Sequence, residues 1–373
     1  MTWVFWIAAL VIAYAYVGYP AWLWLRCRWL PQPVRRGGGE PTVSALMVVR
    51  DEEAVIERKL NNLLALEYPA EKLEMVVVSD GSTDGTERIL EKFVDHPRVK
   101  VLRKLLSQGK AAGLNDAMNW ANAEIVLFTD ARQEIESGAL RALIENFADP
   151  LVGAVSGELM LGDPRNGETG QGMGLYWRVE KKVREWESAS GSVAGATGAI
   201  YSARRDLLEP LPEGTILDDV LLPMQILRKG YRVIFDSRAR AWDAPNLGEA
   251  REFSRKVRTL SGNYQLIQLA PWLLTSANPI RFEFVSHKLL RLLVPFALLA
   301  VLLATFFLPQ PFYRAVLVAQ LVFYALSLVA IAGLKIGALS RVADPARTFV
   351  MLNSAALVAF INFVTRRKAV WAR

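Results

Sequence analysis

Four long apolar stretches constrain this 373-residue chain more than any other feature of its sequence. A helix needs about 20 apolar residues to cross the core of a bilayer. The stretches are Trp3–Leu25, Leu289–Leu308, Ala315–Leu334 and Thr348–Val364. No small-residue cleavage site follows the first stretch, which favours a retained anchor over a secretory signal. Part of the chain is therefore expected to lie in lipid.

Basic residues beside these stretches predict an orientation, because Lys and Arg are enriched on the cytoplasmic side of membrane helices. No basic residue precedes the first stretch, and those that follow it are Arg26, Arg28, Arg35 and Arg36. The long middle segment is therefore expected to be cytoplasmic. The basic tail (Arg366, Arg367, Lys368 and Arg373) does not fit this rule if the fourth stretch spans. Either the tail is an exception or the fourth stretch, which contains Asn353 and Asn362, is interfacial or re-entrant.

Composition excludes several classes of site. The net charge is +7, but the basic residues gather beside the apolar stretches, which favours anionic lipid and diphosphate over nucleic acid as partners. The single Cys27 excludes an internal disulfide, and His96 and His287 are too few for a Cys/His zinc cluster. Any metal must therefore be held by oxygen ligands.

The middle of the chain alternates short β-rich runs with charged helical runs, a pattern typical of a parallel sheet covered by helices. The predicted strands are 44–50, 74–80, 100–104, 124–130 and 152–157. The predicted helices are 52–66, 86–94 and 110–122. Pro31, Pro33 and the glycines at 37–39 predict a linker between the anchor and this α/β region.

Acidic residues follow three of the predicted strands. Asp51, Glu52 and Glu53 follow the first, Asp80 the second and Asp130 the fourth. One acid at a strand end is ordinarily a turn former or a helix cap. Ligands of open α/β sheets bind at the carboxyl ends of the strands, so three such positions predict a binding site. The chain contains neither G-x-G-x-x-G nor G-x-x-x-x-G-K-[ST], which disfavours dinucleotide and P-loop readings.

The order of motifs over residues 42–265 resembles the family-2 glycosyltransferases with the GT-A fold, in the branch of chitin, cellulose, hyaluronan and poly-N-acetylglucosamine synthases. Val48–Glu53 stands at the family's P-x-Y-N-E-E pattern, and Lys110 lies in its G-K-x-x-x-L-N element. Asp130 opens the metal motif, usually D-x-D, and the pair Asp218–Asp219 stands at the E-D pair. The resemblance implies an α/β GT-A domain with a mostly parallel sheet, flanked by N- and C-terminal transmembrane helices.

The resemblance also implies roles for individual residues. Asp219 is the expected catalytic base. The expected nucleotide-sugar-binding residues are Arg50, Glu52, Asp80, Lys110, Asp130, Arg132 and Arg258. The expected acceptor-side residues are Gly195, Thr197, Gly198 and Asp218. Each of these roles has a structural alternative. The strand-end acids would then be ordinary turn formers or caps, Lys110 a solvated lysine at a helix start, and Asp219 a helix cap.

Two positions depart from the family pattern. Arg132 replaces the second aspartate of D-x-D, so Mg²⁺ or Mn²⁺ would rest on Asp130 alone or with Glu134 or Glu136, and Arg132 could itself contact phosphate. Arg255 and Thr259 replace the Gln and Trp of Q-x-x-R-W, while Arg258 is retained. The aromatic platform for an acceptor sugar is therefore missing. An interfacial helix that binds lipid headgroups through Arg251, Arg255 and Arg258 is an equal alternative there.

The sequence therefore predicts an inverting transferase of the bacterial inner membrane with a cytoplasmic catalytic domain. It would move a sugar from a nucleotide-diphosphate donor, UDP-linked by resemblance, to a growing polysaccharide. The alternatives are transfer of one sugar to a lipid-linked or short acceptor, and a catalytically silent nucleotide-binding subunit. The expected divisions are an anchor (1–28), a linker (29–41), a GT-A domain (42–265), an interfacial segment (266–288) and C-terminal membrane helices (289–373). Export partners are not predicted.

Overall fold

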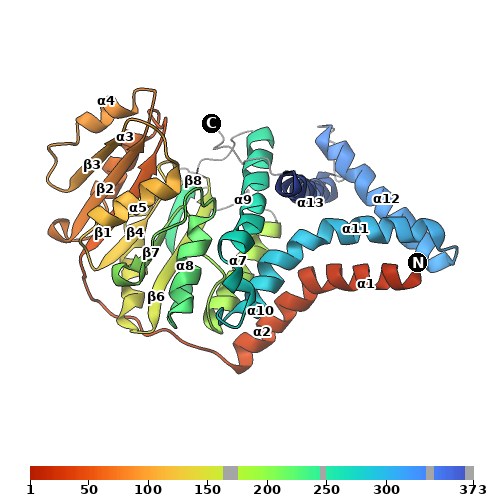
Figure 1. Cartoon of the computed structure of the whole chain (residues 1–373). Coiled ribbons are helices and arrows are strands. Elements are labelled where there is room, and N and C mark those ends of the chain that lie inside the picture. The colour runs from red at the N-terminus through yellow and green to blue at the C-terminus, as the bar shows by residue number, and fades with distance from the viewer. Residues whose placement is uncertain (163–174, 244–248, 333–339, 366–373) are drawn as a thin grey trace.

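A computed structural model describes residues 1–162, 175–243, 249–332 and 340–365. An eight-stranded sheet with helices on both faces forms one part of the molecule, and long apolar helices form the other (Figure 1). The expected combination of an α/β domain with N- and C-terminal helices of membrane-spanning length is confirmed.

The sheet has the strand order β3-β2-β1-β4-β7-β6-β8-β5. Strands β1 to β4 are parallel, β7 runs antiparallel to both of its neighbours, and β8 is parallel to β6 and antiparallel to β5. The strands are β1 (Val43–Val49), β2 (Leu73–Asp80), β3 (Val99–Lys104), β4 (Ile125–Phe128), β5 (Glu134–Ile135), β6 (Val152–Leu161), β7 (Tyr201–Arg204) and β8 (Arg232–Asp243). All five predicted strands are confirmed, whereas β5, β7 and β8 lie outside the predicted ones.

Helices cover both faces of the sheet, as expected for β1, which is buried at every position and apolar at all of them except Ser44. On one face Met47 and its alternate neighbours pack with α3 (Ile56–Leu64), α4 (Thr86–Glu91) and α6 (Ala139–Ile144). On the other face Leu46 and Val48 pack with α5 (Lys110–Trp120) and α8 (Asp218–Arg228). The three helices predicted from the sequence are confirmed, with shorter ends. Short helical turns complete this part: η2 (Ala70–Lys72), η3 (Glu145–Ala148) and η5 (Arg205–Leu207).

Four helices are long and apolar enough to cross a membrane. The first comprises α1 (Thr2–Ala13), η1 (Tyr14–Gly18) and α2 (Tyr19–Trp29). The second comprises α10 (Arg281–Phe284), η7 (Val285–Leu289) and α11 (Leu290–Phe307). The others are α12 (Pro311–Ile331) and α13 (Ser340–Val364). Residues 333–334 of the third predicted stretch and the basic tail lie outside the described residues.

The second of these helices begins at Arg281 rather than at Leu289, where the apolar stretch begins. Its early turns contain Glu283 and His287, which lower the hydropathy of this region. Both side chains are buried and paired, Glu283 with Arg26 and His287 with Glu180 and Glu187. Tertiary pairing therefore extends the helix beyond the limit that hydropathy predicts.

Two helices lie between the sheet and the membrane-length helices, α7 (Leu175–Ala189) and α9 (Glu249–Leu269) (Figure 1). The turn η6 (Pro271–Leu274) follows α9. Helix α13 packs against α9 and α12. In Figure 1, α13 is seen almost end on, whereas α1 and α11 run across the picture, so α13 crosses their direction.

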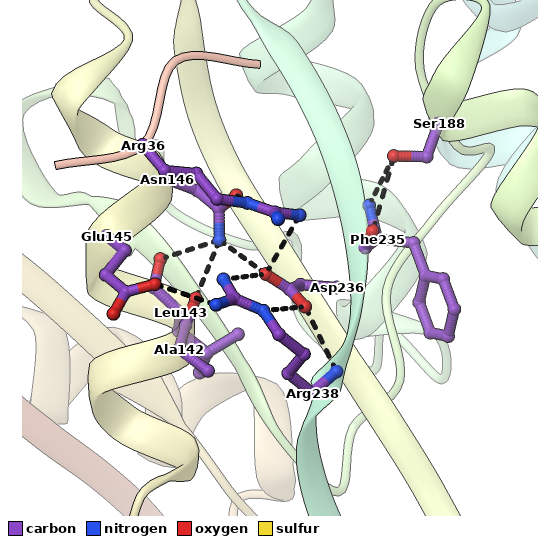
Figure 2. Close-up of polar contacts among 9 residues, drawn as sticks. All are labelled: Arg36, Ala142, Leu143, Glu145, Asn146, Ser188, Phe235, Asp236 and Arg238. Carbon is purple, nitrogen blue, oxygen red and sulfur yellow. Dashed lines mark hydrogen bonds and ion pairs between the residues drawn. The ribbon is translucent and has the colours of Figure 1, made fainter. Parts of the chain in front are cut away.

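The linker after α2 is fastened to the α/β domain. Gly37 donates its backbone N–H to the carbonyl of Glu145 over 2.9 Å, and Arg36 donates to Oδ1 of Asn146 over 3.2 Å. Figure 2 shows how Asn146 and Arg238 both hydrogen-bond the buried carboxylate of Asp236 on β8. The linker thus joins a buried polar network at the edge of the sheet.

Candidate active site

The acids that follow β1 shape the loop that follows β2. Asp51 has a φ of 54°, and its Oδ1 accepts the backbone N–H of Thr83 over 2.7 Å. Oε2 of Glu53 accepts the N–H of Gly85 over 3.0 Å. Because carboxylates that accept backbone N–H groups stabilise tight turns, both side chains hold the two loops together. The structure therefore gives Asp51 and Glu53 a local structural role at the strand ends.

Asp80 is fully buried at the end of β2. Its carboxylate accepts hydrogen bonds from the hydroxyl of Ser107 (2.7 Å) and the backbone N–H groups of Gln108 and Gly109 (2.8 Å each). Gly109 has a φ of +92°, a conformation that glycine adopts without strain, and α5 starts directly after it. Asp80 therefore fixes the loop that delivers Lys110. Its role in nucleotide-sugar binding stays a prediction.

Lys110 brings together acids from distant parts of the chain. Its Nζ lies 3.0 Å from Oδ1 of Asp130 and 3.2 Å from Oδ2 of Asp218. Burial alone favours the neutral form of this lysine, but the charges of Asp130, Asp218 and Asp219 outweigh burial and raise its pKa. Residues predicted for the donor side and the acceptor side thus form one charged cluster.

The loop before β7 wraps around Asp219. The backbone N–H of Gly198 donates to Oδ2 of Asp219 over 3.1 Å. A Cβ on Gly198 would lie 3.4 Å from Oδ2 of Asp130 and 3.5 Å from Oδ2 of Asp219, so the glycine separates the two carboxylates with no side chain between them. Gly195 has a φ of +124°, and a Cβ there would approach Val220 to 3.0 Å. The predicted glycines thus permit a close approach of this loop to α8.

The carboxyl of Asp219 titrates in an unusual range. Burial raises its pKa to about 6, and the negative charges of Asp218 and Asp130 act in the same direction. The positive charges of Lys110 and Lys288 oppose this rise. A carboxylate with a pKa near neutrality is suited to general-base chemistry, because it is ionised at neutral pH and still accepts a proton readily.

Asp130 fits a divalent cation as one protein ligand. Among the described residues no three His, Cys, Asp or Glu side chains form a metal-binding group. A cation bound to a diphosphate, however, takes only one or two carboxylates from the protein. Lys110 pairs with Oδ1 of Asp130, and Oδ2 lies 3.4 Å from the position of a Cβ on Gly198. Glu136 accepts the indole N–H of Trp242 over 2.7 Å and so faces β8 instead.

Arg132 lies beside Glu52 near the same strand end. Burial raises the pKa of Glu52, whereas the charge of Arg132 opposes this rise and the charge of Asp130 adds to it. Both side chains are half-buried. A guanidinium therefore stands where the family pattern has a second carboxylate. Arg50, also predicted for the donor, donates to the hydroxyl of Ser107 over 3.2 Å.

The predicted arginine of α9 is not in direct contact with this cluster. Arg258 is half-buried and has no hydrogen bond or ion pair with the residues that the structure describes. Arg255 lies 3.7 Å from Oδ2 of Asp243 at the end of β8. The side chain of Arg251 is outside the described part of the chain. Whether Arg258 reaches a diphosphate stays a prediction.

Lys59 is a site residue that sequence reasoning missed. It is buried under the Asp130 loop, where its Nζ donates to Oγ1 of Thr129 (2.8 Å) and to the carbonyl of Gln133 (2.6 Å). Burial lowers the pKa of this lysine to about 7, against the charge of Asp130. The sequence did contain a signal for this residue, because Lys59 follows Ile56 by three positions and so lies on the apolar face of α3. A lysine on such a face needs buried partners.

Residues 44–211 match the model of the glycosyl transferase family 2, a range that runs from β1 to the loop before α8. This segment is a family-2 glycosyltransferase domain. A solved mannosyltransferase from Pyrobaculum calidifontis, in complex with GDP-Man and Mn²⁺, is similar over 98% of this chain and 99% of its own, with a TM-score of 0.74 and 25% identity. The α/β domain thus has the GT-A-like fold, and the described part of the chain adds four helices of membrane-spanning length.

The curated relatives of this chain are named for different products. The beta-monoglucosyldiacylglycerol synthase of Synechocystis is 27% identical over 199 residues, which are 52% of this chain and 42% of the relative. The poly-beta-1,6-N-acetyl-D-glucosamine synthase of Staphylococcus aureus is 24% identical over 234 residues, 60% of this chain and 55% of the relative. The chain spans about half the length of these relatives.

Proposed function

We propose that the chain transfers a sugar from a nucleoside-diphosphate sugar to a hydroxyl of an acceptor held at the membrane, with inversion at the anomeric carbon. One observation carries this proposal. Asp219, whose pKa is raised to about 6, lies beside the cluster in which Lys110 pairs with Asp130 and Asp218. A base for the acceptor and positive charge for the departing diphosphate thus stand side by side.

In this mechanism the acceptor oxygen attacks the anomeric carbon as its proton passes to Asp219. The bond between that carbon and the diphosphate oxygen breaks, and the nucleoside diphosphate leaves with the bonding electrons. Lys110 stabilises the growing negative charge on the diphosphate, since its ammonium is already oriented by two carboxylates. The N–H of Gly198 holds the carboxylate of Asp219 in place. Loss of the proton from the product complex resets the base.

A divalent cation belongs to this proposal with Asp130 as its protein ligand. The mannosyltransferase with the similar fold was solved with Mn²⁺. Bound between Asp130 and the diphosphate, Mg²⁺ or Mn²⁺ would neutralise charge on the leaving group. Arg132 supplies a second positive group near Glu52. The nucleoside is assigned to Asp80, Arg50 and the loop that they hold.

The names of the relatives are consistent with two classes of acceptor for this chain. One is a growing polysaccharide, and the other is a lipid that receives one sugar. The catalytic domain, assigned to residues 42–265, would face the cytoplasm of a bacterial inner membrane, with residues 1–28 as the anchor. The direction of α13 across α1 and α11 supports an interfacial place for the last apolar stretch.

A donor screen tests the function. Purified full-length protein in neutral detergent is given UDP-, GDP- and dTDP-linked sugars with a bacterial lipid extract, and release of nucleoside diphosphate is measured. One donor should be consumed with a matching mass increase in a lipid. A ladder of masses would instead identify a polymer. If no donor is consumed with any acceptor while a nucleoside diphosphate still binds, the silent-subunit alternative replaces the proposal.

A further inference from the structure

Two basic side chains face the acceptor side of the site without an acidic partner. Arg184 lies on α7, and Lys288 lies in the π-helical turn η7 at the start of a membrane-length helix. Both are half-buried. Arg184 donates to the hydroxyl of Ser156 over 2.7 Å and lies 4.7 Å above the ring of Phe235. Within the described ranges, neither side chain has a carboxylate at ion-pair distance.

A short chain of hydrogen bonds connects Arg184 to Asp219. Oγ of Ser156 accepts from Arg184 and also from the backbone N–H of Thr197, over 3.1 Å. The next N–H along the chain, that of Gly198, donates to Asp219. The positive charge of Lys288 also acts on Asp219 and lowers its pKa. Both basic groups are therefore neighbours of the proposed base.

The sheet order shows which substrate these groups face. Asp130 follows β4, Gly198 precedes β7, and Ser156 lies on β6, in the order β4-β7-β6. The Asp130 cluster, where the diphosphate is assigned, is therefore on one side of Gly198, and Arg184 is on the other. Arg184 thus lies on the acceptor side, and Lys288 lies close enough for its charge to act on both Arg184 and Asp219.

Helix α7 is fixed on both sides. Ser188 exchanges hydrogen bonds with the backbone of Phe235 on β8 (Figure 2). On the membrane side, the two ring nitrogens of His287 each lie 2.7 Å from a carboxylate of α7, those of Glu180 and Glu187. Arg291 and Tyr19 bind the same two carboxylates. Glu180 and Glu187 therefore already have ion-pair partners. Arg184 and Lys288 remain available to bind a ligand.

We propose that Arg184 and Lys288 bind the phosphate of an anionic lipid acceptor and so present a hydroxyl of that lipid to Asp219. The inference rests on the proposed transfer reaction and names its acceptor class. The negative charges of Glu180, Glu187 and Asp219 act on both groups, but from beyond ion-pair distance. A half-buried cation with no such close partner is costly, and a phosphate in contact with both basic groups lowers that cost. Because Lys288 belongs to a helix of membrane-spanning length, the anion reaches it from the bilayer. A neutral glycan chain offers no such group.

Lipid binding by the full-length protein in neutral detergent tests this assignment. The probes are a short-chain phosphatidic acid, a diacylglycerol with the same chains, and inorganic phosphate, each measured by displacement of a fluorescent phosphatidic acid. Lys288→Met should weaken phosphatidic acid roughly tenfold or more, the usual effect of losing a charged hydrogen bond. Lys288→Arg should restore it. Binding of diacylglycerol should be the same in wild type and Lys288→Met.

Arg281→Met is the matched control, because Arg281 is an exposed basic residue at the start of the same helix. It should leave phosphatidic acid binding near wild type, whereas general attraction to a basic surface predicts equal losses in both variants. Wild-type binding by Lys288→Met overturns the site, and inorganic phosphate that competes as well as the lipid overturns the lipid assignment. Nucleoside diphosphate binding should be unchanged in every variant, which shows that they are folded. The transfer reaction itself is tested separately, by the turnover of Asp219→Asn.

Discussion

The backbone N–H of Gly198 donates a hydrogen bond of 3.1 Å to Oδ2 of Asp219. This contact orients the carboxylate through a backbone group, so a side-chain change at position 219 leaves the donor in place. The same oxygen lies 3.5 Å from the position that a Cβ on Gly198 would occupy. The glycine therefore leaves no side chain between Asp219 and Asp130.

Asp219→Asn should reduce turnover by roughly 10²- to 10⁴-fold, because an amide cannot take the proton of the acceptor. The amide oxygen can still accept the N–H of Gly198, so folding and donor affinity should change little. Steady-state kinetics with the true donor and acceptor measure the first quantity, and nucleotide titration measures the second. Asp218→Asn is the control, with a milder loss expected because Asp218 pairs with Lys110. Wild-type turnover in folded Asp219→Asn contradicts the mechanism.

The pH profile gives an independent test of the same group. Since the base works ionised and its pKa is raised to about 6, kcat/KM should fall as the pH drops through that value. Asp218→Asn removes a negative charge that raises this pKa, so the acid limb should move to lower pH. Lys288→Met removes a positive charge that lowers it, so the limb should move to higher pH. The charged groups that face Asp219 are Asp218, Asp130, Lys110, Lys288 and Arg184. If the acid limb lies at the same pH in the wild type, Asp218→Asn and Lys288→Met, the group that titrates is a residue other than Asp219.

The strand-end acids could be predicted from sequence because parallel strands present their carboxyl ends at one edge. Asp80 and Asp130 thus appeared at the correct edge before any contact was known. Strand β8 escaped prediction because Asp236 and Arg238 interrupt its apolar pattern, and their partners lie far away in the sequence, at Asn146 and Glu145 (Figure 2). Polar residues in a buried strand are acceptable only once those partners are in place.

The acceptor side was harder to predict for the same reason. Helix α7 is not among the helices predicted from the sequence. Its Glu187 is buried because His287, one hundred residues later, and Tyr19 bind it. Lys59 likewise interrupts the apolar face of α3 in the sequence, and its role is evident only from its hydrogen bond to Thr129. Long-range pairs of this kind follow from the packing of whole elements and leave no local pattern.

Removal of divalent cations should abolish most of the activity. Asp130 keeps one oxygen clear of Lys110, and a single carboxylate with a diphosphate is sufficient to hold Mg²⁺ or Mn²⁺. Turnover is measured in excess chelator and after the addition of each metal. Asp130→Asn should lose the response to metal, whereas Glu136→Gln should keep it, because Glu136 faces Trp242. Full activity in chelator would show that Lys110 and Arg132 alone neutralise the diphosphate.

The orientation in the membrane can be read from two engineered cysteines. The basic residues after the first helix predict a cytoplasmic α/β domain. Glu71 is exposed on that domain, and Gln310 is exposed in the connection between α11 and α12, close to the start of α1 in Figure 1. In a Cys27→Ser background, a membrane-impermeant maleimide should label Gln310→Cys in intact cells and Glu71→Cys only after the membrane is permeabilised. The two sites control for each other, because each is exposed and only their side of the bilayer differs. Labelling of Glu71→Cys in intact cells, with Gln310→Cys protected, would reverse the orientation and place the donor site outside the cytoplasm, where nucleotide sugars are not supplied.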